Sequence, residues 1–306
     1  MSQSNTLSYR ASGKLLITGE YVVLDGATAL ALPTRLGQRL EVTPTAKAGC
    51  SWKSFDHNGL TWFEVLFSKN GDILSHSKDG KVTASTLKQI LTVAQKLNPD
   101  FDPFNGNHIE THLEFPNNWG LGSSSTLLYS IAQWAKIDAY QLLSQSFGGS
   151  GYDVAVPAYN NPILYTLEED EPKVKSQQLP WLFKEQLYFV HLNQKMSSKD
   201  GIAHYKKMKL TGEIPVEKIT QLTHRIAAET SLENVIPLFE EHESILSEFL
   251  QLPTIKQRLF PEYPGLIKSL GAWGGDFIMV SGDDASLSYF KEKGYTTILP
   301  YSDMIA

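Results

Sequence analysis

The chain has 306 residues, of which 42% are hydrophobic and 20% are charged. This balance is typical of a globular protein long enough for two domains, and it argues against disorder. A formal net charge of -6 argues against a broad nucleic-acid-binding face, and the single cysteine, Cys50, excludes an intrachain disulfide and a cysteine metal cluster.

The hydropathy of the chain bears on where in the cell the protein is expected. No stretch of about 18 apolar residues occurs, and residues 1–10 lack the apolar segment of a signal peptide. We therefore expect a cytoplasmic protein that binds neither membranes nor nucleic acids.

Residues 8–33 are the first informative segment, and they predict two or three short strands with tight turns. Lys14 and Glu20 lie there in an otherwise apolar stretch. One interpretation is a buried pair in which Lys14 faces an anion or an acidic catalytic group and Glu20 orients it. The other is a strand whose charged ends reach solvent.

Strands are predicted at 36–44 and 60–67, and an amphipathic helix at 84–97. Residues 107–115 alternate, with a polar face made of His108, Glu110, His112 and Glu114. Side chains two residues apart on one strand are separated by about 7 Å, which is wide for ligands that share one ion. We therefore interpret this face as solvated rather than as a metal site.

Residues 115–131, FPNNWGLGSSSTLLYSI, form the centre of the functional prediction. A Gly-Leu-Gly turn leads into serines at the start of a helix, where free N–H groups and the helix dipole favour an anion. The alternative is that Ser123 or Ser124 only caps the helix. The stretch fits neither the P-loop, because no lysine follows its last glycine, nor the dinucleotide fingerprint, because a third glycine is absent.

A helix is predicted at 139–145, and residues 148–159, GGSGYDVAVPAY, then place Asp153 in a glycine turn at the edge of an apolar run. Asp153 is either functional or bonded to its own backbone.

Residues 168–180 are predicted to connect two domains. After a strand at 187–192, the polar loop 193–200 either holds an anionic substrate or is simply exposed. Helices are predicted at 216–229 and 232–250, and His242 on the second is interpreted as a core or rim histidine rather than a ligand. Residues 264–281 predict two strands around a glycine turn, followed by a helix at 284–293 and a strand at 295–299.

Three of these stretches resemble, in order, the motifs of the GHMP small-molecule kinases. The second motif, Pro-x-x-x-Gly-Leu-Gly-Ser-Ser, is matched by Pro116, Gly120, Leu121, Gly122, Ser123 and Ser124. The first is matched by Ala11, Gly13, Lys14, Gly19 and Glu20, with Ser12 in place of proline and Tyr21 in place of histidine. The third is matched by Gly271, Ala272, Gly274 and Gly275, with Trp273 in place of the middle glycine.

The resemblance implies the family's two-domain α+β fold. It predicts an N-terminal ATP-binding domain over residues 1–175, like the second domain of ribosomal protein S5, and a C-terminal ferredoxin-like domain over residues 176–306. It implies a kinase that uses ATP and Mg²⁺ on a small molecule and that is a monomer or a homodimer.

The resemblance also implies site residues. Lys14 and Asp153 would be the catalytic pair, and Ser124 would reach Mg²⁺. The ATP-binding residues would be Pro116, Gly120, Leu121, Gly122, Ser123, Ser124 and Ser125. The substrate-binding residues would be Glu20, Tyr21, Ser150, Tyr152, Lys195, Ser197, Ser198, Gly271, Gly274 and Gly275.

Tyr21, the run GSGYDV at 149–154 and Asp276 resemble phosphomevalonate kinases, so the expected substrate is phosphomevalonate or mevalonate. Two features depart from the family. Leu142 stands where mevalonate kinases carry a Mg²⁺-binding glutamate, and Trp273 is expected to narrow the phosphate side or to close over the ligand. The alternatives are diphosphomevalonate decarboxylase and a non-catalytic homologue that senses a nucleotide or metabolite.

Overall fold

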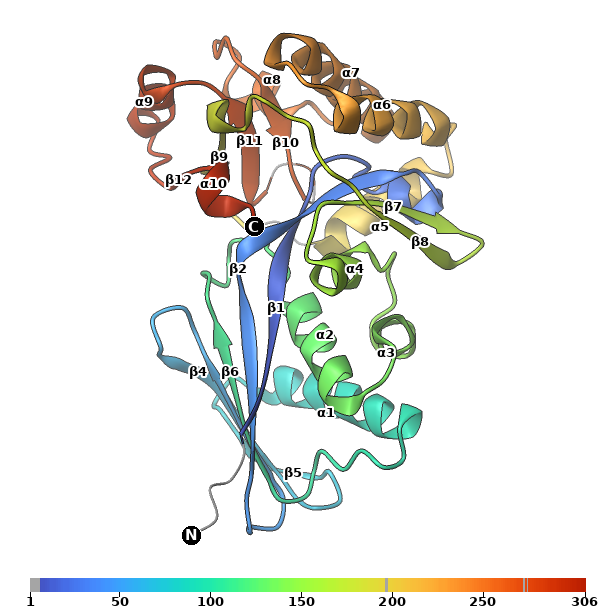
Figure 1. Ribbon diagram of the computed structural model, residues 1–306, viewed down its shortest axis with the longest axis vertical. Coiled ribbons are helices and arrows are strands. Elements are labelled where there is room, and N and C mark those ends of the chain that lie inside the picture. The colour runs from blue at the N-terminus through green and yellow to red at the C-terminus, as the bar shows by residue number, and fades with distance from the viewer. Residues whose placement is uncertain (1–5, 196–197, 272, 274) are drawn as a thin grey trace. The chain divides into compact units, whose positions relative to one another are not determined.

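The computed structural model describes residues 6–195, 198–271, 273 and 275–306 (Figure 1). The chain forms two compact units that alternate along the sequence. The first comprises the chain up to Gly13, then Leu36–Asn117 and Leu121–Ala158, and the second comprises Lys14–Arg35, Asn118–Gly120 and Tyr159–Ala306. The predicted domain boundary at 175/176 stays a prediction.

The sheet of the first unit has the strand order β5-β4-β3-β6-β2, with β1 paired to β2. The β5–β4, β4–β3 and β6–β2 pairs are antiparallel, whereas β3 and β6 are parallel. The strands are β1 (Leu7–Leu16), β2 (Ala29–Pro44), β3 (Cys50–Phe55), β4 (Thr61–Phe67), β5 (Ile73–His76) and β6 (Asn107–Leu113). The second unit takes the end of β1 and the start of β2.

Helices α1, α2 and α3 lie on one side of this sheet and share one hydrophobic core with it (Figure 1). The helices of the first unit are α1 (Lys81–Leu97), α2 (Ser123–Ala135), α3 (Ala139–Ser146) and α4 (Tyr152–Tyr159). In α1 the buried Leu87, Ile90, Leu91 and Ala94 follow the helical period, as the sequence predicts. In β6 the residues Ile109, Thr111 and Leu113 are buried, while the polar residues between them are half-buried.

The second unit contains a four-stranded antiparallel sheet of order β10-β11-β9-β12. Its strands are β9 (Leu187–His191), β10 (Ile267–Ser269), β11 (Phe277–Ser281) and β12 (Ile298–Pro300). Its helices are α5 (Ser198–Met208), α6 (Val216–Ala228), α7 (Leu232–Leu250), α8 (Ile255–Leu259), α9 (Asp284–Glu292) and α10 (Tyr301–Met304), with short 3₁₀ turns η1 (Val22–Asp25) and η2 (Lys184–Gln186). Helices α6 and α7 pack against each other, and α7 and α8 contact β10.

The predicted connection over residues 168–180 is wrong in its local structure. The acidic segment after residue 168 is not a connection but the second strand of a hairpin, β7 (Ile163–Glu168) and β8 (Glu171–Ser176). Glu169 and Asp170 both have positive φ, at 51° and 64°, which is the geometry of a two-residue hairpin turn. Without glycine or asparagine at these positions, the sequence carries no strong hairpin signal.

No helix among the described residues has both the length and the hydropathy that crossing a membrane requires.

Candidate functional site

Two glycines in left-handed backbone conformations form the turn that leads into α2. Gly120 and Gly122 have φ of +67° and +87°, and Gly122 is the N-cap, with no side-chain hydrogen bond capping the helix. Ser123 and Ser124 are therefore the first helical residues and not caps, so that interpretation was wrong. The N–H groups of the first turn lack partners within the helix, which leaves them suited to an anion.

The rest of the first turn of α2 is fixed by hydrogen bonds. The Ser125 hydroxyl donates to the Gly122 carbonyl at 2.9 Å, and the Thr126 hydroxyl lies 2.7 Å from Gln38 Oε1 on β2. Ser125 and Thr126 are buried, whereas Ser124 is exposed. The exposed hydroxyl of Ser124 is thus the one available to a ligand or a ligand-bound metal.

A pocket of about 280 Å³ opens beside this helix terminus, entirely within the first unit. Ser123, Ser124 and Asn117 line one part of it. Its other walls are largely aromatic and aliphatic, and they include Trp52, Trp62, Phe63, Leu87 and Phe147. A flat heteroaromatic ring suits such walls, because aromatic side chains stack on its faces.

In the second unit, residues of all three motifs come together. The Lys14 ammonium donates to the Gly120 carbonyl at 3.4 Å. A Cβ at Gly120 would lie 2.0 Å from Asp276 Oδ2, so the Asp276 carboxylate contacts the Gly120 backbone directly. Gly271 is also close, because a Cβ there would lie 3.9 Å from the same oxygen.

The short segment 118–120 is anchored to the four-stranded sheet. The Trp119 ring packs edge-on against Phe277, with centroids 5.3 Å apart, and lies 6.2 Å from the His191 ring. His191 Nε2 lies 3.3 Å from the Asn118 carbonyl oxygen. The sequence prediction missed this anchoring, because β9 and β11 are far from the motif in sequence.

Glu20 is fully buried in the second unit, within a charged network. It pairs with Lys268, and His242 Nε2 lies 3.5 Å from its other oxygen. Lys268 also lies 2.9 Å from Glu243, which accepts a hydrogen bond from the Ser269 hydroxyl.

Burial raises the pKa of Glu20 to about 7, although Lys268 opposes that shift. Burial alone would lower the pKa of Lys268, because it disfavours the charged form. The carboxylates of Glu20 and Glu243 have the larger effect and raise the pKa of this lysine. Burial also lowers the pKa of His242, whose Nε2 accepts from the Gly19 N–H at 3.1 Å. Of the two positions expected for His242, core or rim, the structure shows the core. The buried partner of Glu20, however, is Lys268 and not the expected Lys14.

Tyr21 contacts helix α5. Its φ is +62°, its ring stacks on Tyr205 with centroids 5.7 Å apart, and a Cβ at Gly201 would lie 2.2 Å from its hydroxyl. Tyr205 in turn donates to Asp25, which also pairs with Lys209. Tyr21 therefore borders the helix that follows the predicted substrate loop.

Asp153 lies in the first turn of α4 rather than in a glycine turn. Asp153 and Tyr152 are half-buried, and Ser150 is buried before the helix begins. Lys14 belongs to the second unit and Asp153 to the first, so their catalytic pairing stays a prediction. In the first unit Leu142 is fully buried in the core, which explains why a hydrocarbon side chain stands there.

Several other predicted residues can be placed. Lys195 is exposed, Ser198 begins α5, and Gly275 is buried. Ser197 and Gly274 lie outside the described residues. Trp273 is 5% exposed and packs in the core of the second unit with Val22, Ala27, Tyr205, Ile219, Leu246 and Leu250. Its expected effect on the phosphate side or on the ligand stays a prediction.

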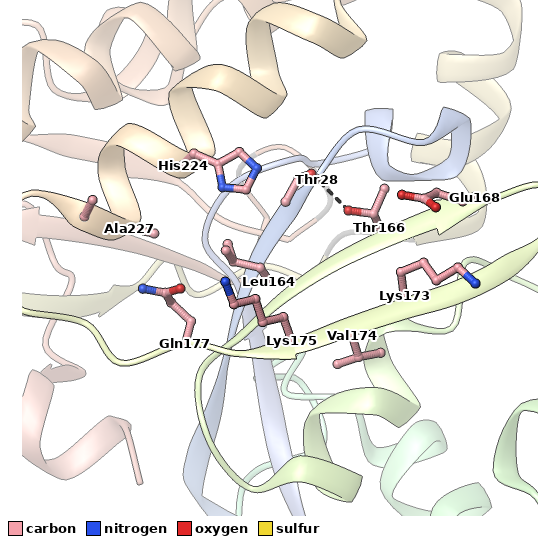
Figure 2. Close-up of a pocket in the computed structure, with 11 residues that line it drawn as sticks. Thr28, Leu164, Thr166, Glu168, Lys173, Val174, Lys175, Gln177, His224 and Ala227 are labelled. Carbon is pink, nitrogen blue, oxygen red and sulfur yellow. Dashed lines mark hydrogen bonds between the residues drawn. The ribbon is translucent and has the colours of Figure 1, made fainter.

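A second pocket, of about 470 Å³, lies in the second unit between the β7–β8 hairpin and α6 (Figure 2). Thr28 and Thr166 share a hydrogen bond of 2.9 Å at its edge, and Lys175, Gln177 and His224 also line it. None of the predicted site residues is among its lining residues.

Comparison with known proteins rests on the fold. The sequence matches no protein-family model and no curated protein. The structure is similar to the mevalonate kinase of Methanococcus jannaschii, with 16% identity, a TM-score of 0.69, and coverage of 97% of this chain and 98% of that one.

Two further solved structures are similar over nearly their whole length. The phosphomevalonate kinase of Streptococcus pneumoniae, in complex with phosphomevalonate and AMPPNP, has 15% identity and a TM-score of 0.66, and the similarity covers 94% of this chain and 95% of that one. The galactokinase of Lactococcus lactis, complexed with galactose, has 11% identity and a TM-score of 0.63, with coverage of 96% and 92%. The predicted α+β fold of the GHMP kinases is thereby confirmed.

Proposed function

We propose that the chain is an ATP-dependent small-molecule kinase that transfers the γ-phosphoryl group to phosphomevalonate or mevalonate. The observation that carries this proposal is the uncapped N-terminus of α2 beside an aromatic pocket in the first unit. This arrangement offers N–H donors for phosphates and stacking walls for a base, side by side, which is what a nucleoside triphosphate needs. The shared fold of three kinases that act on different small alcohols supports the reaction class.

The first unit would hold ATP. Ser123, Ser124 and Ser125 would give their backbone N–H groups to the phosphates, and the exposed ring of Trp62 would flank the base. Mg²⁺ prefers oxygen ligands and keeps several of its waters, so one exposed hydroxyl, that of Ser124, together with phosphate oxygens fits its needs. When bound, Mg²⁺ would neutralise charge on the phosphates.

Phosphoryl transfer requires positioning and charge stabilisation more than covalent chemistry. Lys14, whose ammonium already contacts the Gly120 carbonyl, would stabilise the charge that develops on the transferred group. Asp153 would accept the proton of the substrate hydroxyl. Glu20, being fully buried, is better suited to fixing Lys268 than to touching substrate.

The test is ADP release from Mg-ATP with mevalonate, phosphomevalonate, diphosphomevalonate, homoserine and a few sugars as acceptors. Turnover with mevalonate or phosphomevalonate would support the proposal. CO₂ release with diphosphomevalonate would instead identify the decarboxylase.

Asp153→Asn separates a kinase from a nucleotide sensor. We expect at least a hundredfold loss of kcat, because the general base is removed, with the Kd for ATP within about twofold of wild type. Nucleotide binding without turnover across the panel, in wild type and variant alike, would favour the sensor and contradict the kinase.

A further inference from the structure

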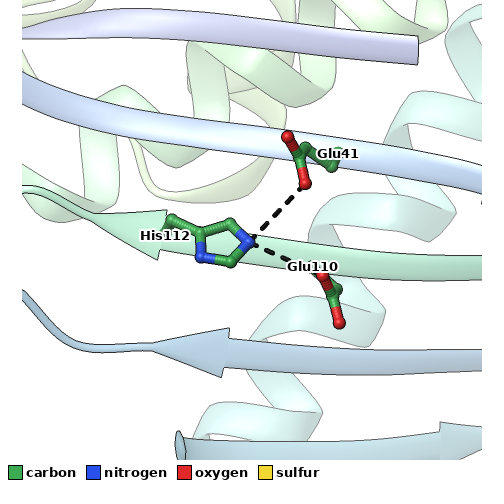
Figure 3. A group of neighbouring side chains, drawn as sticks. All are labelled: Glu41, Glu110 and His112. Carbon is green, nitrogen blue, oxygen red and sulfur yellow. Dashed lines mark ion pairs between the residues drawn. The ribbon is translucent and has the colours of Figure 1, made fainter. Parts of the chain in front are cut away.

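Three potential metal ligands meet on the sheet of the first unit, away from the α2 terminus. Glu41 lies on β2, and Glu110 and His112 lie on β6 (Figure 3). Glu41 and Glu110 are directly opposed in the antiparallel register. Like charges in such a cross-strand pair repel. Arg39, which pairs with Glu41, offsets part of this repulsion from the outer side of the carboxylate.

The ligand atoms converge on one point. His112 Nε2 is 3.7 Å from Glu41 Oε2 and 3.6 Å from Glu110 Oε2, and all three atoms lie within 4.8 Å of one another. These separations exceed normal hydrogen-bond lengths. Ligands of a tetrahedral Zn²⁺, each at about 2.0 Å from the ion, lie roughly 3.3 Å apart, so a small inward movement would let the three share one ion.

The outer oxygens of both carboxylates already have partners. Arg39 Nε lies 3.2 Å from Glu41 Oε1, and His108 Nε2 lies 3.2 Å from Glu110 Oε1. The Ser51 hydroxyl, 2.7 Å from His108 Nδ1, supports the second contact. Such outer contacts orient carboxylates toward a metal, and here they leave the two inner oxygens facing His112.

The imidazole of His112 is also held in place. Phe55 stacks on it in parallel, with centroids 4.8 Å apart and an interplanar angle of 8°. Although the three side chains are 27–32% exposed, the His112 Nε2 atom itself is shielded from solvent and has no hydrogen-bond partner among the described residues. His112 Nε2 lies between two carboxylate oxygens, where either a proton on the ring or a bound cation would be stabilised.

We infer that Glu41, Glu110 and His112 bind one divalent transition-metal ion, with Zn²⁺ the best match to one nitrogen and two oxygen ligands, and that this ion links β2 to β6. The competing arrangement is a protonated His112 that pairs with both carboxylates and needs no metal. The site is independent of the proposed kinase activity, because neither the α2 terminus nor Lys14 nor Asp153 takes part in it.

The experiment is calorimetric titration of the EDTA-treated, dialysed full chain with ZnCl₂, without nucleotide. We expect one Zn²⁺ per chain in wild type, and binding at least tenfold weaker in His112→Ala and in the near-isosteric Glu110→Gln. The matched control is His57→Ala, an exposed histidine of the same unit, which should bind like wild type. Co²⁺ should give a visible absorption band in wild type that His112→Ala lacks.

Circular dichroism of the metal-free variants separates lost ligands from lost structure, and Glu110→Gln serves if His112→Ala fails to fold. The inference is overturned if wild type binds no Zn²⁺, if both ligand variants bind it as tightly as wild type, or if His57→Ala loses as much affinity as they do.

Discussion

Gly120→Ala tests the contact between the second and third motifs with a single methyl group. The new Cβ would lie 2.0 Å from Asp276 Oδ2 and 2.4 Å from its Cγ, and the backbone φ at this position is +67°. The left-handed conformation costs an L residue about 1–2 kcal/mol. Displacing the carboxylate adds an overpacking cost of about 1–3 kcal/mol, so we expect the free energy of unfolding to fall by about 2–5 kcal/mol.

Gly148→Ala is the matched control, because Gly148 has φ of +68° and its Cβ would meet no atom within 4 Å. It should show only the backbone cost of about 1–2 kcal/mol. Urea denaturation of both variants measures the difference, and the double variant Gly120→Ala/Asp276→Ala should recover part of it. Equal destabilisation by the two alanines would refute the contact between Gly120 and Asp276.

Two further predictions concern the buried charges of the second unit. Lys268→Met leaves Glu20 and Glu243 buried without their cation and should lower the free energy of unfolding by about 3–5 kcal/mol in urea. The exposed control Lys69→Met should stay within about 0.5 kcal/mol of wild type, and a similar effect of both changes would contradict the network. Burial raises the pKa of Glu20 from 4.5 to about 7, so between these pH values the folded chain binds more protons than the unfolded chain. The contribution of Glu20 to stability is therefore complete below about pH 4.5 and is lost as the pH rises through 7. Burial lowers the pKa of His242, so below its unfolded value of 6.5 the unfolded chain binds more protons at this residue than the folded chain does. The contribution of His242 to stability therefore rises with pH in that range, opposite to the contribution of Glu20. The difference in unfolding free energy between wild type and Glu20→Gln isolates the glutamate and should decrease over this range, whereas a flat difference would count against the burial effect.

Local patterns in the sequence were sufficient for much of the fold. The apolar period of α1, the alternation in β6 and the glycines before α2 are local signals, and each predicted its element correctly. The order of the three motifs predicted the fold as a whole, which the solved kinase structures confirm. The β7–β8 hairpin was missed because its turn uses Glu169 and Asp170 at positive φ instead of glycine or asparagine.

The parts of the site that the sequence could not reveal depend on long-range contacts. The sequence indicates that a buried Glu20 requires a cationic partner. It does not identify Lys268 as that partner, because this lysine is 248 residues away. Trp273 sits in a glycine-rich motif, yet its burial depends on apolar residues of η1, α6 and α7. The ligand set proposed for His112 includes Glu41, which comes from the adjacent strand, so the spacing along residues 107–115 alone does not reveal it.

The alternation of the two units along the chain has a consequence for synthesis on the ribosome. The first unit has all its residues once Ala158 has emerged, so it can fold early. Glu20, made near the beginning, must wait for Lys268, and at about 5–20 residues per second this delay is roughly 12–50 s. During that interval the segment from Lys14 to Arg35 lacks C-terminal residues of the second unit to which it belongs. Until those residues are made, this largely apolar segment cannot reach its folded packing and stays accessible to chaperones.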